Sequence, residues 1–510
     1  MSRAAIDLLG RLKGQGADIR GLSADSRSLR AGEAFVAYPG ASADGRRHIA
    51  DALARGAVAV LWEREGFSWD DSWRAPNVAV EGLRLMAGEI AHEVYDRPSE
   101  KLWLAGVTGT NGKTSCSHWI AQALNALGRK TAVVGTLGSG IPAALGTEPM
   151  ANFVPSANTT PDAIELQRRL AEFLQAGAQG AAMEVSSIGL DQGRVNGVQF
   201  DVALLTNLSR DHLDYHGDME RYAAAKTQLF ETPGLSGAVL NMDDVLGVRI
   251  AQKLAGSKLA CAGYSAHAGV ASAAGLEFFL EAENVRLTRH GLAFGLLSSW
   301  GRAEVHSALL GRFNVANLLG VLGVLLGAGV ELEPAVAALN AVTPPPGRMQ
   351  RLGGGSKPLA VVDYAHSPDA LEAALMSLRP LVGADGGRLV CVFGCGGDRD
   401  RGKRALMGAI AARNADQVVL TSDNPRSEDP LEIITDILEG VLGEEQRPGQ
   451  PPLVLASRRE AIASTIAGAA AGDVVLIAGK GHEDYQETAG QRDYFSDAAV
   501  AAEALAGWTR

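Results

Sequence analysis

The segment Gly106-Val-Thr-Gly-Thr-Asn-Gly-Lys-Thr114 contains the residue types of a phosphate-binding loop. Its internal glycines let backbone N–H groups turn inward around phosphate oxygens. Lys113 is placed to reach the β- and γ-phosphates of a nucleotide, and the hydroxyl of Thr114 is placed to bind Mg²⁺. The N-terminus of a following helix adds its own preference for anions. This segment therefore predicts binding of a nucleoside triphosphate.

The flanking sequence supports this interpretation. An apolar run over 102–107 predicts a strand before the loop, and the pattern over 113–127 predicts a helix after it, closed by Gly128. The strict motif has glycine where this chain has Val107, so the segment is a variant phosphate loop. The alternative is a tight turn that happens to contain Gly-Lys-Thr.

Polar residues follow two further expected strands. Glu184 ends the run over 180–185, and Asp211 with His212 follows the run over 202–206. Carboxyl ends of parallel strands meet at one edge of a sheet, so these side chains are expected beside the phosphate loop. Taken alone, each is more often a solvated or capping residue. Lys226 lies in an expected helix over 219–230, and that context alone predicts a solvated surface lysine.

Three polar turns occur late in the chain, each after an expected strand. They are the segments 394–403, 423–426 and 479–483, and they follow the runs 388–393, 417–421 and 474–477. The same edge rule predicts that they converge on one pocket. Arg399, Arg426 and Glu483 would give this pocket two cations and one carboxylate, which suits an amino-acid-like zwitterion. The alternative for each turn alone is an ordinary polar loop.

The elements around these motifs alternate between strands and helices. From residue 102 onward the alternation predicts parallel sheets covered on both faces. Thr343-Pro-Pro-Pro-Gly-Arg348 can continue neither a helix nor a central strand, so it predicts a linker. A second series of strands and helices follows it, from the strand expected over 359–364 and the helix over 368–378. A chain of 510 residues should contain about three domains, which we place at 1–97, 98–342 and 343–510.

Composition excludes several classes of protein. The chain has 47 Lys and Arg against 58 Asp and Glu, a net charge of −11, which argues against a dedicated nucleic-acid binder. Its four cysteines are too few for a disulfide framework and are not spaced for zinc. The longest apolar run, 318–330, is too short to span a bilayer and predicts a buried helix. We expect a soluble cytoplasmic α/β protein.

With these motifs in this order, the sequence resembles the Mur ligase family over essentially the whole chain. The resemblance rests on the motifs above and on Asp25-Ser-Arg, Ala41-Ser-Ala-Asp-Gly-Arg, Asn158-Thr-Thr-Pro, Glu184-Val-Ser-Ser, Asp191-Gln-Gly-Arg, Asp211-His-Leu-Asp-Tyr-His and Asp363-Tyr-Ala-His. It implies an α/β fold of three domains: an N-terminal α/β domain for a UDP moiety, a central P-loop ATPase with a parallel sheet, and a C-terminal Rossmann-like domain for an amino acid.

The resemblance also implies an activity. It indicates ATP-dependent addition of meso-diaminopimelate to UDP-MurNAc-L-Ala-D-Glu through an acyl-phosphate, a cytoplasmic step of peptidoglycan precursor synthesis. Mg²⁺ and ATP would be required, and the only partners would be these small molecules, with no nucleic acid and no membrane. The chain is expected to be a monomer.

Individual residues are assigned by the same resemblance. Catalytic roles fall to Lys113, Glu184, His212 and Lys226, and metal binding to Thr114, Glu184, His212 and Lys226 as a carbamate. CO₂ addition would turn the Lys226 cation into an anionic oxygen ligand. Nucleotide binding falls to Gly109, Thr110, Asn111, Gly112, Lys113, Thr114, Ser115, Asn317, Arg348, Asp363 and His366. The UDP-linked substrate would be held by Ala24, Ser26, Ala41, Ser42, Ala43, Asn158, Thr159, Thr160, Ser186, Gln192 and Arg194. Diaminopimelate would be held by Arg399, Asp423, Asn424, Pro425, Arg426, Gly479 and Glu483.

One departure and three alternatives stay open at this point. Ile188 stands where many members of the family have His. A lysine-adding ligase of the same family would need an acidic group at the position where Arg426 would bind diaminopimelate. A folate polyglutamate ligase would leave the first domain with its Asp25-Ser-Arg pattern unexplained. A P-loop GTPase switch is the alternative from another class, but the chain lacks the Asn-Lys-x-Asp turn that recognises guanine.

Overall fold

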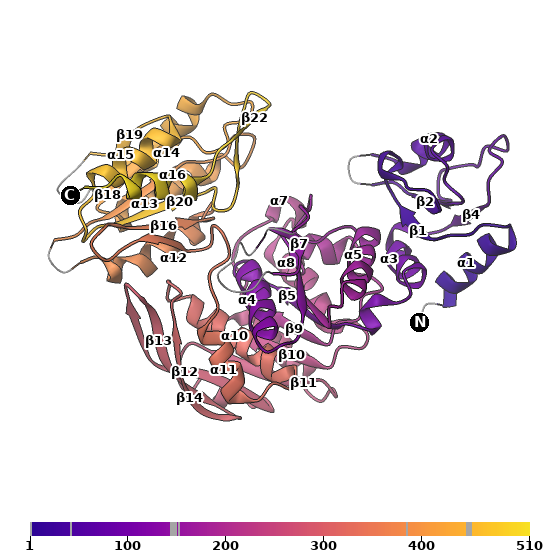
Figure 1. Cartoon of the computed structure of the whole chain (residues 1–510), viewed down its shortest axis with the longest axis horizontal. Coiled ribbons are helices and arrows are strands. Elements are labelled where there is room, and N and C mark those ends of the chain that lie inside the picture. The colour runs from indigo at the N-terminus through magenta and orange to yellow at the C-terminus, as the bar shows by residue number, and fades with distance from the viewer. Residues whose placement is uncertain are drawn as a thin grey trace. The chain divides into compact units, whose positions relative to one another are not determined.

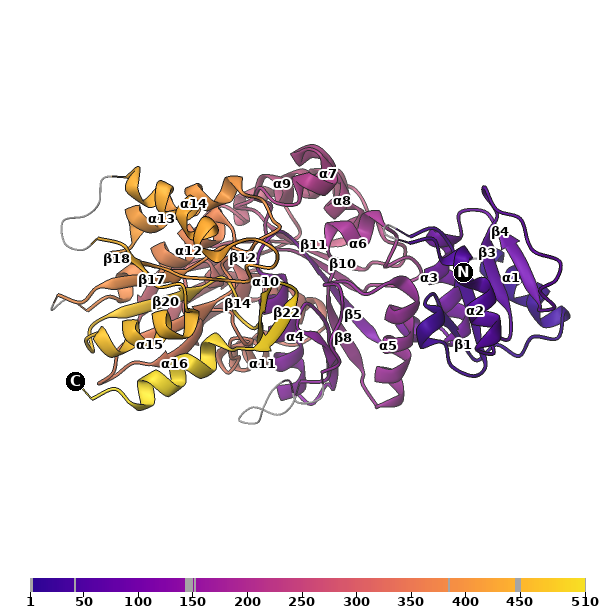
Figure 2. The same cartoon turned by 90° about the horizontal axis from the view of Figure 1, so that it is seen from above.

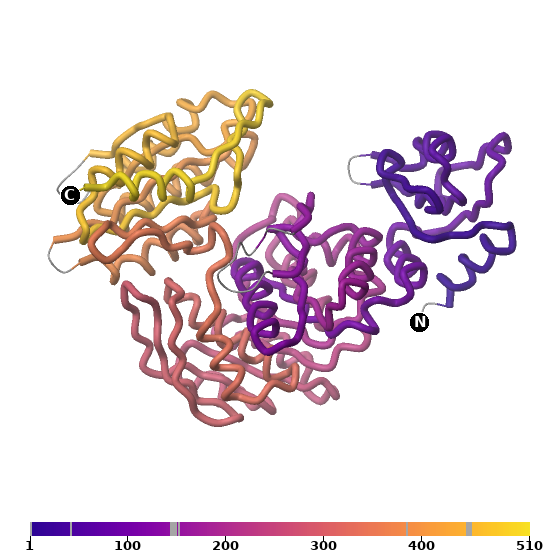
Figure 3. Tube along the Cα trace, viewed as in Figure 1, coloured from indigo at the N-terminus to yellow at the C-terminus, as the bar shows by residue number. Residues whose placement is uncertain are grey.

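The computed structural model describes residues 3–40, 43–142, 150, 153–383, 386–444 and 451–509. They form two compact units, which are treated separately below (Figures 1 and 3). Unit 1 comprises Met1–Ser265, Gly269–Leu280 and Gly320–Ala338. Unit 2 comprises Ala266–Ala268, Glu281–Leu319 and Leu339–Arg510.

The N-terminal part of unit 1 is a four-stranded parallel sheet. Its strands lie in the order β1 (Gly21–Ser23), β2 (Glu33–Ala37), β3 (Val60–Glu63) and β4 (Asn77–Val80). Helices α1 (Arg3–Gly14) and α3 (Leu83–Val94) bury apolar side chains with one set of strand residues, which includes Leu61. The alternate strand residues, among them Trp62, pack with α2 (Ile49–Ala54) and with three aromatic side chains of the loop after β3.

The central part of unit 1 contains the phosphate-loop motif. Its strands follow the order β11-β10-β9-β5-β8-β6-β7 and are parallel except for the last pair. They are β5 (Trp103–Thr108), β6 (Thr131–Gly135), β7 (Gly138–Gly140), β8 (Gly180–Glu184), β9 (Val202–Leu205), β10 (Gly237–Asn241) and β11 (Ala260–Ser265). The expected strands from 102 to 206 are thus confirmed to within about a residue at each end. Because β5 lies between β8 and β9, the turns after these three strands open side by side.

Helices connect these strands, and one of them differs from expectation. α4 spans Lys113–Ala126 as expected. α5 (Ala163–Gln175) begins after Asp162, whose side chain accepts from the N–H groups of Ile164 and Glu165 and caps the helix. α8 (Met219–Thr227) stops early and continues as a 3₁₀ turn over Gln228–Glu231. α9 (Val245–Leu254) follows β10.

The long apolar run forms the buried helix that was expected. It lies in α10 (Asn314–Gly327), whose residues Val321, Leu322 and Val324 are fully buried. A Cβ on Gly323 would lie 2.8 Å from a methyl group of Val239 in β10, so glycine permits this close approach. In the part of the chain that the structure describes, no helix is long and apolar enough to cross a membrane.

An antiparallel set of strands was not predicted. β12 (Phe278–Thr288), β13 (Gly291–Ser298) and β14 (Gly301–Ser307) are joined by short turns, in the order β14-β13-β12. Buried and less buried residues alternate along β13, with Leu292, Phe294 and Leu296 pointing inward. This period of two is the available sequence signal for these strands.

The C-terminal part of unit 2 is a Rossmann-like layered sheet. Its order is β15-β16-β20-β17-β18-β19, and only β15 runs antiparallel. The strands are β15 (Gln350–Gly353), β16 (Leu359–Asp363), β17 (Leu389–Phe393), β18 (Gln417–Leu420), β19 (Leu453–Val454) and β20 (Val474–Ala478). The four strands expected between residues 359 and 477 are confirmed to within about a residue.

Helices cover both faces of this sheet. Figure 2 shows α12 (Pro368–Leu378), α13 (Gly402–Asn414) and α14 (Pro430–Leu442) on one face, and α15 (Arg458–Gly468) and α16 (Asp497–Ala506) on the other. Alternate residues of β17 pack accordingly: Cys391 lies in the first core, and Val390 and Val392 lie in the second. The four cysteines are all buried and unbridged.

A buried ion pair connects this second core to the strand ends. Arg458 and Asp497 are both fully buried and make two bonds of 2.7 Å. Arg458 also donates to the carbonyl oxygens of Ala478 at 2.9 Å and Ser422 at 3.4 Å. Those two residues directly precede Gly479 and Asp423, so one guanidinium ties together the ends of β18 and β20.

We therefore expect Arg458→Met to destabilise unit 2 by about 3–5 kcal/mol, because it leaves the Asp497 carboxylate buried without its partner. The neighbouring pair Arg459–Glu503 is exposed, so Arg459→Met is the matched control and should cost under about 1 kcal/mol. Native-state hydrogen exchange of the β18 and β20 amides measures both effects. Equal protection in the two variants would contradict this assignment.

Candidate functional site

The phosphate-loop motif forms the turn between β5 and α4. Gly109 has φ +145°, and a Cβ there would lie 1.8 Å from the hydroxyl oxygen of Thr206, so the position requires glycine. The N–H of Asn111 donates to the side-chain oxygen of Asn207 at 3.0 Å, and the N–H of Thr110 donates to the backbone carbonyl of Asn207 at 2.8 Å. Val107 is a fully buried strand residue. The departure from the strict motif therefore falls inside β5, outside the turn itself.

Two lysines meet at this turn. The Nζ of Lys113 donates to the carbonyl oxygens of Gly109 at 2.8 Å and Thr110 at 2.9 Å. The Nζ of Lys226 donates to the same Gly109 oxygen at 2.8 Å. Both amino groups therefore lie at the loop where phosphate oxygens would bind.

The expectation of a solvated surface lysine at position 226 is wrong. Lys226 is 1% exposed, and its Nζ lies 4.4 Å from the centre of the Tyr222 ring. The helix pattern missed this because the buried face of α8 consists of alanines, the tyrosine and the lysine itself. Burial, together with the positive charge of Lys113, holds the pKa of Lys226 well below its ordinary range.

Glu184 ends β8 beside the loop and is 1% exposed. Its Oε2 accepts from the hydroxyls of Thr114 at 2.9 Å and Thr136 at 3.1 Å, and its Oε1 accepts from the N–H of Thr136 at 2.8 Å. A Cβ on Gly135 would lie 2.1 Å from that Oε1. Sequence reasoning missed Thr136, which follows β6 and orients the carboxylate.

This arrangement fits a hard divalent cation. The carboxylate is buried, and the bonds described above come from neutral donors, so a bound cation would offset the cost of burying the anion. Carboxylate and hydroxyl oxygens are the ligands that Mg²⁺ prefers. Among the described residues, no group of three or more His, Cys, Asp or Glu side chains is placed to hold a metal ion.

His212 lies at the same edge of the sheet. It has φ +51°, and its side chain is 45% exposed with Nε2 3.6 Å from Asp211 Oδ2. Its ring meets Tyr222 edge-on at 6.1 Å. Burial lowers the pKa of His212, and Lys113 and Lys226 lower it further while Asp211 opposes them. His212 thus lies close enough to Lys113 and Lys226 for their positive charges to act on its ring.

Five of the residues expected to hold the UDP-linked substrate form one network that starts at Glu184. Thr160 donates to the carbonyl of Glu184 at 2.9 Å and to the Ser186 hydroxyl at 3.1 Å. Arg194 donates to the Thr160 carbonyl at 2.9 Å and to Gln192 at 2.8 Å. The hydroxyls of Thr159 and Thr136 are 3.0 Å apart. Contacts therefore run continuously from the carboxylate to Arg194.

The remaining candidates for this substrate lie elsewhere in unit 1. Asn158 is exposed, with its carbonyl bonded to Ser156. Ala24 and Ser26 follow β1, where Asp25 caps a 3₁₀ turn. The carbonyl of Ala43 accepts from Gly40 at 2.8 Å. Ala41 and Ser42 lie outside the described residues. Ile188 lies in α6 (Ser187–Asp191), where the neighbouring Ser187 bonds to His216 at 2.9 Å.

The three polar turns of unit 2 converge as expected. The amide of Asn424 donates to Glu483 Oε2 at 2.7 Å, and Arg426 donates to the Gly397 carbonyl at 2.7 Å. A Cβ on Gly479, which has φ +115°, would lie 2.6 Å from Asp423 Oδ2. Pro425, which precedes Arg426, packs closely against Gly397. A Cβ on Gly397 would lie 1.9 Å from the carbonyl oxygen of Pro425. A guanidinium and a carboxylate therefore share one cluster.

Arg399 belongs to the edge of this cluster. Its side chain is on the exposed loop after β17, and a Cβ built on Gly396 would lie 2.9 Å from Arg426 Nη1 and 3.8 Å from Arg399 Cγ. The two arginines thus flank the same glycine. The structure gives Arg399 no direct bond to Glu483 among the described residues.

A hairpin that was not predicted supports Arg426. It consists of β21 (Tyr485–Thr488) and β22 (Gln491–Tyr494), joined by Ala489 and Gly490, both with positive φ. Arg426 itself has φ +52°; its N–H donates to the Glu487 carbonyl at 3.0 Å, and its carbonyl accepts from Ala489 at 2.6 Å. Apolar and polar residues do not alternate over 485–494, so Gly490 was the available sequence signal for a tight turn here.

Residues expected to bind nucleotide in unit 2 lie mostly around Tyr364. The Arg348 guanidinium is 4.6 Å from the centre of this ring, and His366 Nδ1 is 2.8 Å from the Tyr364 carbonyl oxygen. Asp363 accepts from the N–H of Met349 at 2.7 Å; burial raises its pKa, and Arg348 opposes that shift. Asn317 is in α10 and donates to Asn314 at 2.9 Å.

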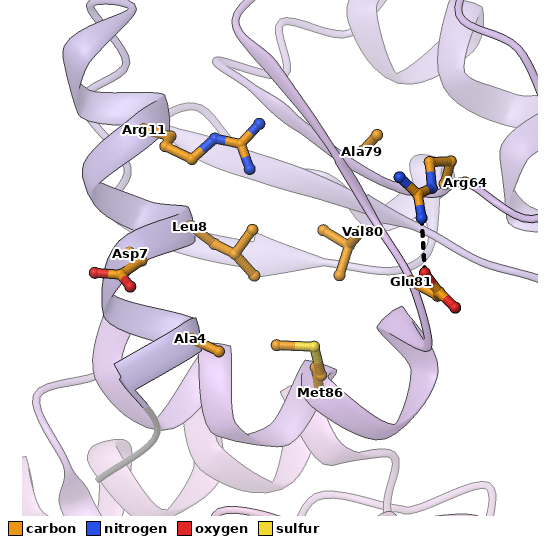
Figure 4. Close-up of a pocket in the computed structure, with 9 residues that line it drawn as sticks. All are labelled: Ala4, Asp7, Leu8, Arg11, Arg64, Ala79, Val80, Glu81 and Met86. Carbon is orange, nitrogen blue, oxygen red and sulfur yellow. Dashed lines mark hydrogen bonds and ion pairs between the residues drawn. The ribbon is translucent and has the colours of Figure 1, made fainter.

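A hollow in the N-terminal part of unit 1 lies apart from these clusters. It has a volume of about 360 Å³ and an apolar wall that includes Leu8 and Val80 (Figure 4). The ion pair between Arg64 and Glu81, at 2.7 Å, borders it. None of the residues predicted to bind substrate or nucleotide lines this hollow.

Comparison with known proteins identifies the family. Three family descriptions match: "Mur ligase family, catalytic domain" over 18–95, "Mur ligase middle domain" over 107–325 and "Mur ligase, glutamate ligase domain" over 347–481. A protein of Ectopseudomonas mendocina is 51% identical over 490 residues, covering 96% of both chains. One of Nitrosomonas europaea is 47% identical over 498 residues, covering 96% of this chain and 93% of its own. The chain belongs to the Mur ligase family.

Solved structures agree with this assignment. A structure titled as UDP-N-acetylmuramoyl-L-alanyl-D-glutamate–2,6-diaminopimelate ligase is 38% identical, with a TM-score of 0.68 and coverage of 96% of this chain and 95% of that one. A Thermotoga maritima MurF ligase in complex with ADP is 16% identical with a TM-score of 0.61, covering 96% of both chains, and shows the shared fold. As a Mur ligase, the chain is an ATP-dependent ligase. The domain boundaries expected at 97/98 and 342/343 stay predictions.

The geometry of the loop predicts the effect of Lys113→Ala. Nucleotide binding should weaken at least about tenfold, because the ammonium that would pair with phosphate is lost. The fold should persist, since the bonds of Lys113 to Gly109 and Thr110 lie within its own turn. Calorimetric titration with ATP-Mg²⁺ and a circular dichroism spectrum measure the two effects.

The exposed Lys258 provides the control, because Lys258→Ala removes an equal charge from the same unit. A folded Lys113→Ala variant that binds ATP as tightly as Lys258→Ala would show that the turn is not a phosphate loop.

Proposed function

We propose that this Mur ligase adds meso-diaminopimelate to UDP-N-acetylmuramoyl-L-alanyl-D-glutamate, with conversion of ATP to ADP and phosphate. The observation that carries the proposal is the presence of Arg426 and Glu483 in one cluster of unit 2, each held by its own partners. The distal end of diaminopimelate bears one carboxylate and one ammonium, so it complements this pair. Both relatives described above are named UDP-N-acetylmuramoyl-L-alanyl-D-glutamate–2,6-diaminopimelate ligase, and the alignment covers nearly their whole length.

The reaction proceeds in two transfers. A γ-carboxylate oxygen of the D-glutamyl residue attacks the γ-phosphorus of ATP, and the bond to ADP breaks, which gives an acyl-phosphate. The amine of diaminopimelate then attacks the acyl carbon, loses a proton, and expels phosphate as the amide forms. Such a reaction needs reactants held in line and charge neutralised more than it needs covalent chemistry from the protein.

Unit 1 supplies the residues for phosphate. Residues Gly109 to Ser115 surround the β- and γ-phosphates in this proposal, and Lys113 exchanges its two loop carbonyls for phosphate oxygens. Phosphate is the stronger partner for an ammonium because it carries full negative charge. In unit 2, Arg348, Asp363, His366 and Asn317 are proposed to contact the nucleotide.

Thr114 and Glu184 are proposed to hold Mg²⁺, with His212 and a carbamylated Lys226 as further ligands. When bound, Mg²⁺ neutralises negative charge on the transferring phosphoryl group. Thr136 keeps the Glu184 carboxylate oriented toward Thr114 through its two bonds. These bonds fix the plane of the Glu184 carboxylate next to the phosphate loop.

The state of Lys226 supports its proposed modification. The lowered pKa of Lys226 raises the fraction of its amino group that is neutral, and only the neutral amine can attack the carbon of CO₂. Loss of a proton from nitrogen then leaves an anionic carbamate. That product carries negative charge next to Lys113, whose positive charge disfavours a second ammonium at this position.

The UDP-linked substrate is proposed to lie along the network from Glu184 to Arg194. Asn158, Thr159, Thr160, Ser186, Gln192 and Arg194 would bind the muramoyl-dipeptide, and Ala24, Ser26 and the turn 41–43 would bind uridine diphosphate. Arg399, Asp423 to Arg426, Gly479 and Glu483 would bind diaminopimelate. We place the reaction in the cytoplasm and expect a monomer.

The main rival is addition of lysine. Lysine lacks the distal carboxylate, so it would leave the Arg426 guanidinium unpaired and bring an ammonium toward it. A GTPase switch does not account for a match to all three Mur ligase domains. The direct test is the wild-type enzyme with UDP-MurNAc-L-Ala-D-Glu and ATP-Mg²⁺. ADP release should depend on meso-diaminopimelate, and equal kcat/KM for lysine would overturn the proposal.

Lys226→Ala should lower ligation by about 10–100-fold, the usual loss when a residue that supports a metal site is removed. If the carbamate is the functional group, formate or acetate added to this variant should restore part of the rate, and chloride at equal ionic strength should not. The readouts are ADP release with each anion and the Mg²⁺ dependence of the rate. A fully active Lys226→Ala enzyme would contradict the proposed role.

Arg426→Ala should raise the KM for diaminopimelate by a factor of hundreds to thousands, the equivalent of about 3–5 kcal/mol for a broken buried charge pair. The KM for ATP should barely change. The preference for diaminopimelate over lysine should narrow, because the cation that repels lysine is gone. Arg413→Ala, at an exposed pair on α13, is the control. An unchanged ratio of the two kcat/KM values would exclude Arg426 as the specificity residue.

A further inference from the structure

Lys480 is a buried cation inside the amino-acid cluster of unit 2. Its side chain is fully buried, and its Nζ donates to Asn424 Oδ1 at 2.9 Å and to Glu483 Oε2 at 3.0 Å. The same Nζ lies 5.2 Å from the centre of the Tyr485 ring. Taking an ammonium out of water is costly unless several partners compensate it, and here two oxygens and an aromatic face do so.

The bonds of Lys480 decide which way the Asn424 amide faces. An ammonium can only donate, so the amide oxygen must point toward Lys480, and this oxygen also accepts from the N–H of Glu487 at 3.0 Å. The amide NH₂ is consequently directed at Glu483, where it donates to Oε2 at 2.7 Å. Lys480 therefore orients both neighbours.

The same bonds leave one oxygen of Glu483 available. Both donors, Lys480 and Asn424, go to Oε2. Within the described ranges of the chain, the structure gives Oε1 no hydrogen bond. The carboxylate is thus fixed through one oxygen and presents the other, and its side chain is 18% exposed.

The shape of the turn does not depend on Lys480. Gly479 and Gly481 flank it with φ +115° and +53°, and a Cβ on Gly481 would lie 2.8 Å from the carbonyl oxygen of Gly347. These glycines determine the backbone path, because few other residues adopt such angles. The backbone of the turn therefore does not require a lysine at position 480, and the positive charge there has another role.

We propose that Lys480 is a positioning residue that sets the amino-acid specificity of this ligase. It aims Glu483 Oε1 at the distal ammonium of diaminopimelate, and it partly neutralises Glu483. A bare ammonium such as that of lysine consequently gains little from this carboxylate. Full binding needs the distal carboxylate on Arg426 as well. This inference rests on the proposed function and extends it to a residue outside the predicted site.

The test uses Lys480→Met, which keeps an unbranched side chain of similar length and removes the charge. The KM for diaminopimelate should rise about 10–100-fold, the effect of losing hydrogen bonds to a charged group. The KM for ATP should stay unchanged, and kcat should change less than KM. The ratio of kcat/KM for diaminopimelate to that for lysine should narrow. Lys480→Arg, which retains the charge, should recover part of the preference.

The control is Lys357→Met in the same unit, since Lys357 donates to the Leu505 carbonyl, away from the amino-acid cluster. A folded Lys480→Met enzyme with the wild-type KM for diaminopimelate and the wild-type ratio would overturn the inference. If the wild type ligates neither amino acid, the proposed function itself has failed.

A double-mutant cycle keeps the test decisive if Lys480→Met folds poorly. Lys480→Met combined with Glu483→Gln leaves no unpaired charge between the two positions. If Lys480 acts through Glu483, adding Lys480→Met to Glu483→Gln should change the KM for diaminopimelate by less than about twofold. Two effects that multiply would show independent roles and refute the inference.

Discussion

Parallel pairing of neighbouring strands is the constraint on which the rest of the structure depends. In unit 1, Val107 pairs with Glu184 and Thr108 with Leu205, so the turns after β5, β8 and β9 open at one edge. In unit 2, Val392 pairs with Ile477 and Phe393 with Leu420. A slip of one residue in register would reverse the faces of a strand and shift the turn that follows it. The register of each sheet therefore determines which turns meet, and the turns carry the polar side chains.

Charge is distributed differently at the two edges. Around Gly109, two lysines share one carbonyl oxygen while Glu184 is held by hydroxyl and amide donors, an arrangement that accepts polyphosphate and a divalent cation. In unit 2 a cation and an anion are held apart by their own partners, Arg426 by Gly397 and Glu483 by Asn424 and Lys480. The first edge suits an anion and the second suits a zwitterion, which are the two kinds of group that an amide ligase must bring together.

Much of this could be predicted from the sequence. Continuous apolar runs located β5, β8 and β9 in unit 1 and β16, β17, β18 and β20 in unit 2, but not β10, β11 or β19. The edge rule then predicted which turns would meet. What failed depended on contacts distant in sequence. Lys226 looks like a surface residue on its own helix, but its amino group is buried where it bonds the carbonyl of Gly109, 117 residues away. The same holds for Thr136, Lys480 and the β21–β22 hairpin, whose roles exist only once Glu184, Glu483 and Arg426 are in place.

The central claim is that one cluster recognises a carboxylate and an ammonium at the same time. The most direct measurement compares kcat/KM of the wild-type enzyme for three amino acids: meso-diaminopimelate, L-lysine, which lacks the distal carboxylate, and L-2-aminopimelate, which lacks the distal amine. The account predicts that each of the last two is poorer by roughly tenfold or more, because each leaves one charged partner in the cluster unsatisfied. If either analogue is used as well as meso-diaminopimelate, recognition does not depend on both charges, and the account is contradicted.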